Sequence, residues 1–205
     1  MAPSFVLGRR GGYDYIVTEG IGKQTFSLTY PWDENGYKPY VEYKLNVDDT
    51  GFSMHITAWE QNPRRTVTEH QGSVHNDSCV EWFANFAPLL CDRYFNFEVN
   101  ANGAMRVAFR KDRHDLSLLP LEDIALLNIQ TAIHAETWEV RFQVPFALLR
   151  KYIPGYRYEK GMQIRTNFYK CGDLAQFPHF GIWKEYPLEK PDFHRPEFFG
   201  VVVPD

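Results

Sequence analysis

Apolar and polar residues alternate along much of this chain, and that period of two restricts its fold more than any other feature. Residues 41–47 (VEYKLNV), 52–57 (FSMHIT) and 138–144 (WEVRFQV) each place apolar or aromatic side chains at every second position. Because successive side chains of a β-strand point to opposite faces of a sheet, the pattern predicts strands with one buried face. The 3.6-residue period of an amphipathic helix is scarce, so an all-β fold is expected.

Turn residues divide the chain into many short strands. Asp48-Asp49-Thr50-Gly51 separates two of the alternating runs, and Asn102-Gly103, a favoured type I′ pair, closes a second hairpin. Further strands are expected at about 13–18, 25–30, 78–86, 94–100, 105–110, 136–144, 162–170, 179–184 and 199–203. Many short strands with frequent turns are typical of an antiparallel β-sandwich or jelly-roll. No linker, repeat or low-complexity tract divides the chain, so we expect residues 1–205 to form a single domain.

Helix is expected in one or two short segments only. Residues 145–152 begin with a proline, which suits a first helical turn, and continue with alanine and leucines, which are good helix formers. Residues 122–127 fit either a turn of helix or a strand.

Charge and composition exclude several classes of function. The chain has 22 Lys and Arg against 26 Asp and Glu and no long basic tract, so no nucleic-acid partner is expected. No apolar stretch approaches 18 residues, so no membrane partner is expected either. The pattern predicts no particular oligomeric state.

The cysteines and the first residues bear on the compartment. Cys79, Cys91 and Cys171 form no CxxC motif and cannot all pair, which favours free thiols in a reducing compartment. Residues 1–10 contain too short an apolar run for a signal peptide. We therefore expect a cytoplasmic location for the chain as written, or an extracellular one if an export signal has been removed.

Motifs of the common catalytic classes are absent from the sequence, among them HExxH, GxSxG and the P-loop. One pair of carboxylates, Glu81 and Glu98, lies on expected strands. Two carboxyl groups about 5 to 9.5 Å apart across a cleft can hydrolyse a glycoside. The alternative use of strand carboxylates, to hold neighbouring side chains or to accept hydrogen bonds from a ligand, is favoured here, so no catalytic residue is predicted.

Three expected strands carry unusual polar side chains on one face. These are Glu81 in the first strand, Asn96, Glu98 and Asn100 in the second, and Arg165, Asn167 and Tyr169 in the third. Amides, carboxylates, a guanidinium and a phenol in convergent rows form a fixed array of hydrogen-bond donors and acceptors. Such an array suits a hydroxyl-rich ligand, but an ordinary outer face with cross-strand pairs such as Glu98–Arg165 would give the same pattern.

Five motifs occur in an order that resembles the family 9 carbohydrate-binding modules, and more closely their stand-alone family 9-like relatives among the DOMON-type β-sandwiches. They span roughly residues 38–203. The motifs are Asp77–Phe83 with Tyr94–Gly103, Trp138–Phe146, Arg165–Tyr169, His179–Trp183 and Phe193–Gly200.

The resemblance implies a β-sandwich that binds a mono- or oligosaccharide, often a glycan end, without cleaving it. In such modules two tryptophans clamp the sugar ring while polar strand residues bind its hydroxyls. By motif position Trp183 is one clamp and Glu81 accepts hydrogen bonds from the sugar hydroxyls. The resemblance places the other sugar-binding residues on the polar strand face described above: Asn96, Asn100, Arg165, Asn167 and Tyr169.

This chain departs from the family pattern at two positions. The second clamp tryptophan is replaced by Val74-His75, so that His75 is the candidate for stacking, with Trp59 or Trp82 as alternatives. The ligand arginine of the middle strand is replaced by Glu98, and its charge would come from Arg106 or Arg165.

The same departures keep a second interpretation open, an intracellular structural or interaction sandwich with a degenerate sugar site. No cofactor is expected, although family members can carry structural calcium, and Asp48-Asp49 or Asn76-Asp77 would supply hard oxygen ligands.

Aromatic residues number 33, and most fall on alternating apolar faces. The alternation assigns eight of them to the sandwich core: Tyr43, Phe52, Phe83, Phe95, Phe97, Trp138, Phe142 and Phe168. Trp59, Tyr169 and Trp183 do not follow the alternation and lie on polar faces or loop edges, and of these Trp183 is the one expected to stack on a ligand.

Overall fold

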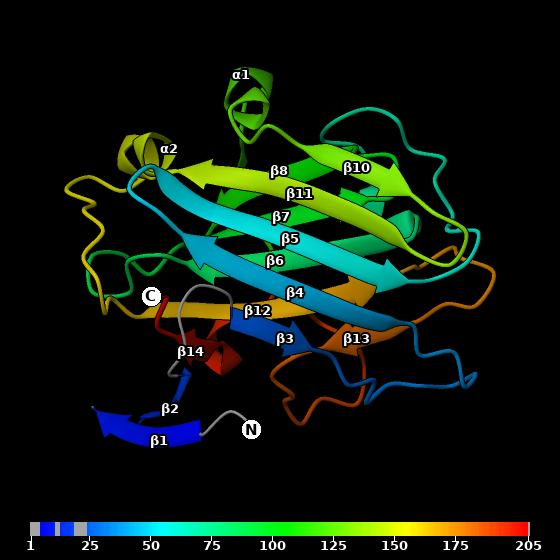
Figure 1. Ribbon diagram of the computed structural model, residues 1–205, viewed down its shortest axis with the longest axis horizontal. Coiled ribbons are helices and arrows are strands. Elements are labelled where there is room, and N and C mark those ends of the chain that lie inside the picture. The colour runs from blue at the N-terminus through cyan, green and yellow to red at the C-terminus, as the bar shows by residue number, and fades with distance from the viewer. Residues whose placement is uncertain (1–4, 11–12, 19–23, 205) are drawn as a thin grey trace.

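Two antiparallel β-sheets lie face to face in the computed structural model, which describes residues 5–10, 13–18 and 24–204 (Figure 1). One sheet has five strands and the other has seven, and every strand pair within them is antiparallel. The all-β sandwich predicted from the alternation is confirmed.

The five-stranded sheet lies in front in Figure 1. In order across the sheet its strands are β10 (Gln130–Ile133), β11 (Trp138–Pro145), β5 (Gly51–Trp59), β4 (Tyr40–Val47) and β3 (Gln24–Ser27). The turn at Asp48–Gly51 joins β4 to β5, as the sequence predicts, and the Asp48 carboxylate accepts hydrogen bonds from the Thr50 and Gly51 amides.

The seven-stranded sheet forms the second layer. In order its strands are β13 (Phe180–Ile182), β12 (Ile164–Cys171), β6 (Cys79–Asn85), β7 (Tyr94–Asn100), β8 (Met105–Arg110) and β9 (Leu116–Leu118), while β14 (Gly200–Val202) also pairs with β12. A separate hairpin is formed by β1 (Phe5–Arg10) and β2 (Tyr13–Thr18).

Helical structure is limited to short segments. They are α1 (Leu121–Ala125), α2 (Phe146–Tyr152) and the 3-10 turns η1 (Val74–Asn76) and η2 (Pro196–Phe198). The ambiguous segment 122–127 therefore contributes to a helix, and Pro145 is the N-cap of α2 rather than its first residue. Strands β9 and β10 were not expected because they bury no residue fully and so lack an alternating apolar face.

The main core lies between the two sheets. Its aromatic side chains include Trp82, whose ring stacks on Phe97 at 5.5 Å between centroids and lies 6.1 Å from Phe142 on the opposite sheet. Seven of the eight aromatics assigned to the core belong to this cluster. Phe83 does not, and that assignment is wrong.

Phe83 belongs to a second apolar cluster on the other side of the seven-stranded sheet, which we call the outer face. There Phe83, Tyr94 and Tyr169 are covered by the segment 183–199, and the Tyr169 ring stacks on Phe193 at 4.2 Å. Every residue of β6 and β7 is buried, since these strands have apolar layers on both faces. Alternation alone cannot assign a face when both faces are buried.

A buried ionic cluster joins the two sheets at one end of the core. The Nζ of Lys170, fully buried on β12, lies 3.1 Å from the carboxylate of Glu60, the residue after β5. Glu60 also accepts hydrogen bonds from Trp138 Nε1 at 2.9 Å and Ser78 Oγ at 2.8 Å. The His179 Nε2 lies 2.6 Å from the same Nζ. The buried charges of Lys170 and Glu60 are therefore paired with each other and hydrogen-bonded, as buried charges require.

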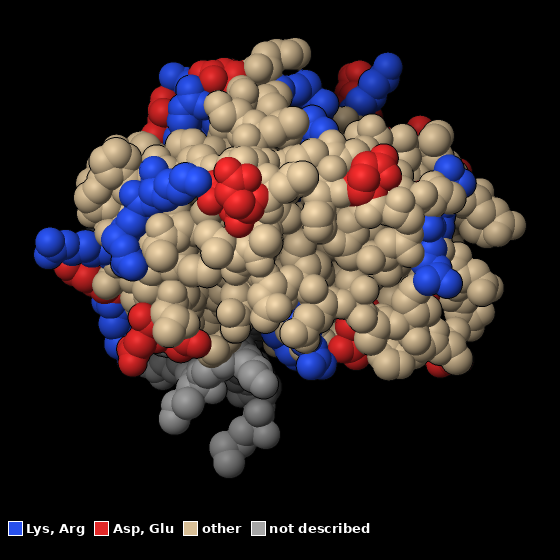
Figure 2. All heavy atoms as spheres, turned by 90° about the horizontal axis from the view of Figure 1, so that it is seen from above, with Lys and Arg blue, Asp and Glu red and all other residues tan. Residues whose placement is uncertain are grey.

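The surface shows both signs of charge intermixed. On the face that carries α1, Lys and Arg side chains lie beside Asp and Glu, without a continuous basic area on that face (Figure 2). Over the part of the chain that the structure describes, each helix is too short or too polar to cross a membrane.

Candidate functional site

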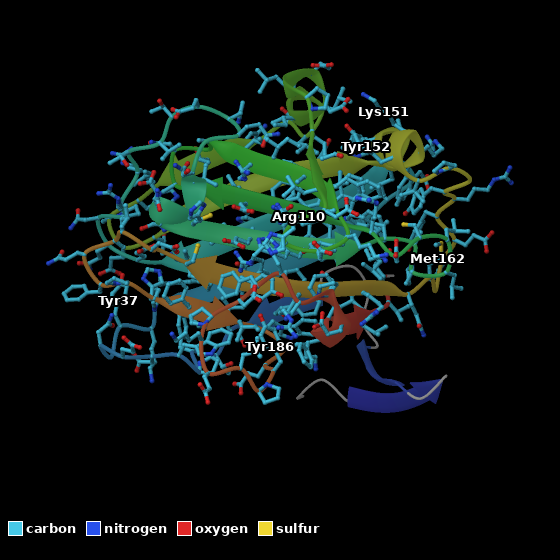
Figure 3. The ribbon with its side chains drawn as sticks, turned by 180° about the vertical axis from the view of Figure 1, so that it is seen from behind. Tyr37, Arg110, Lys151, Tyr152, Met162 and Tyr186 are labelled. Atoms are coloured by element: carbon cyan, nitrogen blue, oxygen red, sulfur yellow. The ribbon has the colours of Figure 1, made fainter. Side chains whose placement is uncertain are left out.

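A cavity of about 720 Å³ opens on the outer face of the seven-stranded sheet. Its floor is formed by side chains of β6, β7 and β8, and its walls by the loops around residues 73–75, 113–116 and 190–194. Arg110 lies near the middle of this face in Figure 3. We call this space the outer-face cavity.

Charged and aromatic side chains share the cavity wall. The charged and histidine residues are Glu34, His75, Glu81, Glu98, Arg106, Arg110, Arg113, Asp173, Lys190 and His194. The apolar and small residues are Ser73, Leu116, Cys171, Phe180, Pro191 and Phe193. The volume lies within the range of about 300–1,000 Å³ that is usual for small-molecule sites, but charged and histidine residues outnumber the apolar ones in this lining.

Strand register brings the central polar residues into one row. Glu81 on β6 is paired with Glu98 on β7, and Glu98 is paired in turn with Arg106 on β8. Because directly paired residues of antiparallel strands project to the same face, all three side chains reach the cavity. Tyr169 on β12 is paired with Glu81 at the other end of this row, but its ring is buried beneath Phe193.

Burial controls the protonation of the two carboxyl groups. It raises the pKa of Glu81 well above its usual value, and the neighbouring Glu98 carboxylate raises it further. The pKa of Glu98 is also raised by burial, although His75 and two arginines oppose the shift. Asn96 Nδ2 donates a 2.5 Å hydrogen bond to Glu98 Oε1. Burial and mutual repulsion therefore both oppose full ionisation of the pair.

Arg110 lies in the same cavity with unused hydrogen-bonding capacity. Its Nη1 donates to His194 Nδ1 at 3.2 Å, while its buried Nε has no hydrogen-bond partner among the described residues. Burial lowers the pKa of His194 to about 2, with Arg110 adding to the effect, so the imidazole is neutral. A buried guanidinium with a free donor is suited to bind an oxygen-rich ligand.

Three of the nine residues predicted from the sequence line the cavity: His75, Glu81 and Glu98. His75 is the most exposed of them, with 42% of its side chain accessible, and its Nδ1 lies 4.0 Å from Glu98 Oε2. The structure thus brings these three together, and their role in binding stays a prediction.

Five other predicted residues do not line the cavity, and four of them bond to loops. Asn100 Nδ2 donates to Val67 O and Asp77 Oδ2, and Asn96 bonds to Glu98 as described. Arg165 Nη2 donates to the Pro196 and Glu197 carbonyls, whereas Asn167 bonds to the backbone of Lys184. Tyr169 donates to Phe193 O at 3.0 Å. The pairing Glu98–Arg165 does not form because β6 lies between their strands.

Trp183 lies outside the cavity. Its ring contacts Phe168 at 5.4 Å and Phe26 at 4.9 Å between centroids, which places it against the core between the sheets. The preceding residue, Ile182, belongs to the outer apolar cluster, so Trp183 points to the opposite side. A stacking role for Trp183 stays a prediction from the resemblance.

Sequence reasoning missed the residues that come from loops and from the sheet edge. Arg110, Phe180, Phe193 and His194 were not predicted as binding residues, although loops held by a rigid sheet often bind ligands. The signal that could have identified Arg110 is its spacing: it lies four residues after Arg106 on the same strand, and therefore on the same face.

Both loops considered for calcium are stabilised by protein donors. The Asp77 carboxylate accepts from the Thr66 amide and hydroxyl and from the Val67 amide. Asp48 forms the turn described above. A calcium ion at either place stays a prediction.

A sequence profile described as carbohydrate-binding family 9 matches residues 14–203 of the chain. That span contains nearly the whole sandwich and all the residues of the cavity. The chain belongs to carbohydrate-binding family 9. A search of curated protein sequences gave no match.

Solved structures agree with membership of family 9. A candidate carbohydrate-binding protein from Bacteroides uniformis is similar at 26% identity and a TM-score of 0.80, over 89% of this chain and 87% of that one. A family 9 carbohydrate-binding module from Caldicellulosiruptor kristjanssonii, in complex with glucose, has 11% identity and a TM-score of 0.59, over 88% and 84% of the two chains. A complex with cellotriose gives 10% identity and the same TM-score, over 88% and 82%. At that identity the Caldicellulosiruptor structures support the fold alone.

Proposed function

We propose that this family 9 chain binds a mono- or oligosaccharide in the outer-face cavity and does not cleave it. The observation that carries the proposal is the row Glu81, Glu98 and Arg106 on the cavity floor. Each sugar hydroxyl both donates and accepts a hydrogen bond, and this row offers carboxyl acceptors beside guanidinium donors. The solved family 9 structures in complex with glucose and cellotriose suggest the class of ligand to test first.

Apolar surfaces for the sugar ring lie beside this row. Phe180 and Phe193 contribute aromatic carbon to the wall, and the half-exposed imidazole of His75 lies at the rim. An aromatic face against the C–H side of a sugar stabilises binding beyond area burial by about 0.5–1.5 kcal/mol if it resembles other aromatic contacts. The cavity thus combines the two kinds of contact that sugar recognition requires.

The arrangement of the carboxyl groups supports binding rather than hydrolysis. A glycoside hydrolase holds one carboxyl on each side of the scissile bond, one protonated and one charged. Here Glu81 and Glu98 lie side by side on neighbouring strands of one floor, and burial raises the pKa of both. Two carboxyl groups side by side on one floor suit hydrogen bonds to the hydroxyls of a ligand.

Isothermal titration against glucose, cello-oligosaccharides and a wider glycan panel tests the proposal. The Glu98→Ala variant removes a cavity carboxyl, and Glu139→Ala on the outer side of the five-stranded sheet is the matched control. We expect Glu98→Ala to weaken binding about tenfold, the cost of one lost hydrogen bond, and Glu139→Ala to leave it unchanged. Absence of binding across the panel, or equal affinity in both variants, would refute the proposal.

A further inference from the structure

Three side chains at one end of the cavity floor bring two thiols and a carboxyl group together. Cys79 and Glu81 are two residues apart on β6 and share its outer face, while Cys171 on β12 is paired directly with Cys79. One ligand atom from each residue lies within 4.8 Å of the others, and Cys171 Sγ is 3.1 Å from Glu81 Oε1. All three side chains are buried.

The sheet holds these groups in place, and the contacts that the two thiols make to backbone carbonyls are long, Cys171 Sγ to His75 O at 3.7 Å and Cys79 Sγ to Val80 O at 3.8 Å. Both strands are central in the seven-stranded sheet, so backbone pairing on either side fixes the three Cα positions. Among the described residues, the only hydrogen bond to the Glu81 carboxyl comes from the Cys171 thiol, a weak donor. A buried carboxyl with so little support is costly unless another group binds it.

Protonation agrees with this geometry. Burial raises the pKa of Cys79 to about 11 and that of Glu81 well above its usual value. The contact with Cys79 and burial raise the pKa of Cys171. These shifts favour the protonated forms, and a cation placed between the three groups would favour loss of their protons.

We propose that Cys79, Glu81 and Cys171 form a binding site for a divalent metal ion of the Zn²⁺ class. Thiolates favour Zn²⁺ and softer ions, whereas Ca²⁺ and Mg²⁺ require oxygen ligands. Bonds of about 2.3 Å to sulfur and 2.0–2.2 Å to a carboxylate oxygen fit three ligand atoms at this spacing.

The site leaves one position of a tetrahedral ion open toward the outer-face cavity. Glu81 and Cys171 line that cavity, whereas Cys79 lies behind them. An open zinc site has three ligands from the protein and a fourth position for water or for an oxygen atom of a bound molecule. A bound ion would replace up to three protons, which pass to the buffer, so its affinity rises with pH.

The proposal does not depend on sugar binding, and its test uses the metal alone. Reduced protein without carbohydrate is titrated with Zn²⁺ by calorimetry, and with Cd²⁺ while the ultraviolet absorption of cadmium–thiolate bonds is followed. We expect one ion per chain, proton release in buffers of different ionisation enthalpy, and a higher melting temperature with metal. The melting temperature and circular dichroism of each variant show whether it folds.

Single-residue variants identify the ligands. Cys79→Ser and Cys171→Ser should each weaken Zn²⁺ binding at least about a hundredfold. The substitution of a residue that only hydrogen-bonds to a metal ligand usually reduces metal affinity by less than that. Cys91→Ser is the matched control, because Cys91 is half-buried and contacts the Arg93 carbonyl instead. Equal affinity in Cys91→Ser and Cys171→Ser, no stoichiometric uptake by folded reduced protein, or a Cys79–Cys171 disulfide that persists in excess reductant would overturn the proposal.

Discussion

Glu81 and Glu98 are paired directly across β6 and β7, both carboxyl groups buried beneath the same cavity. Each raises the electrostatic cost of ionising the other, and burial from both sides of the sheet adds to it. This relationship links the pH dependence of stability to the site at which we propose that a ligand binds.

The first prediction concerns that pH dependence. The pKa of Glu81 is higher in the folded than in the unfolded chain, so its favourable contribution is complete at low pH and is lost as pH rises from its unfolded pKa toward its folded one. The glutamine of Glu81→Gln cannot ionise, so the free energy of unfolding of this variant should rise relative to that of the wild type as pH increases from 5 to 8. The difference should be on the order of 1–3 kcal/mol, which is the cost of a buried polar group with poor hydrogen bonding. Urea unfolding at both pH values measures this difference.

Exposed Glu136→Gln is the control for that experiment, since it changes one charge without changing a buried group. It should leave the difference between pH 5 and pH 8 as in the wild type. If Glu81→Gln and Glu136→Gln behave alike, Glu81 does not carry the buried proton that the structure assigns to it.

The second prediction concerns His75 at the rim of the cavity. His75→Ala should weaken sugar binding by about 2–12-fold, the equivalent of one aromatic contact, and His75→Phe should restore most of it. The side chain is 42% accessible, so neither change should lower the melting temperature much. His134→Ala, at an exposed histidine beyond β10, is the matched control for calorimetry. A loss in both alanine variants, or in neither, would argue against contact between His75 and the sugar.

The third prediction separates Trp183 from the cavity. Its ring packs on Phe26 and Phe168, so Trp183→Ala should destabilise the fold by about 3 kcal/mol, as large-to-small changes in partly buried aromatics do. Sugar affinity measured below the melting transition should stay within twofold of the wild type, because the ring does not line the cavity. A stable variant that no longer binds sugar would instead support the stacking role implied by the family resemblance.

The contrast between Glu81 and Trp183 shows how far the sequence could lead. Alternation along β4, β5 and β11 predicted the sandwich. Glu81 and Glu98 were identified by their residue types, because alternation does not assign a face in β6 and β7, where both faces are buried. Strand β13 has three residues, too few for parity to show which side Trp183 occupies. Phe193 and His194 come from a loop without periodicity, whose path over the outer face depends on tertiary contacts such as the bond from Tyr169 to Phe193.

The fourth prediction concerns the buried ionic cluster between the sheets. Lys170→Met would leave the Glu60 carboxylate in the core without its cation, and should lower the free energy of unfolding by about 3–5 kcal/mol. Burial raises the pKa of Glu60, but Lys170 and the hydrogen bond from Trp138 outweigh it, so the carboxylate of the folded protein is charged. Urea unfolding at pH 7 measures the loss.

The double variant Lys170→Met/Glu60→Gln distinguishes an unpaired charge from a packing defect. The amide oxygen that replaces the carboxylate of Glu60 can still accept from Trp138 Nε1 or Ser78 Oγ, while no charge remains to be stabilised. If the cost arises from the uncompensated carboxylate, the double variant should be more stable than Lys170→Met alone by at least about 1 kcal/mol, since the second change removes a buried charge. Additive losses would show that Lys170 acts through the packing of its side chain, and that the ion pair contributes little to holding the two sheets together.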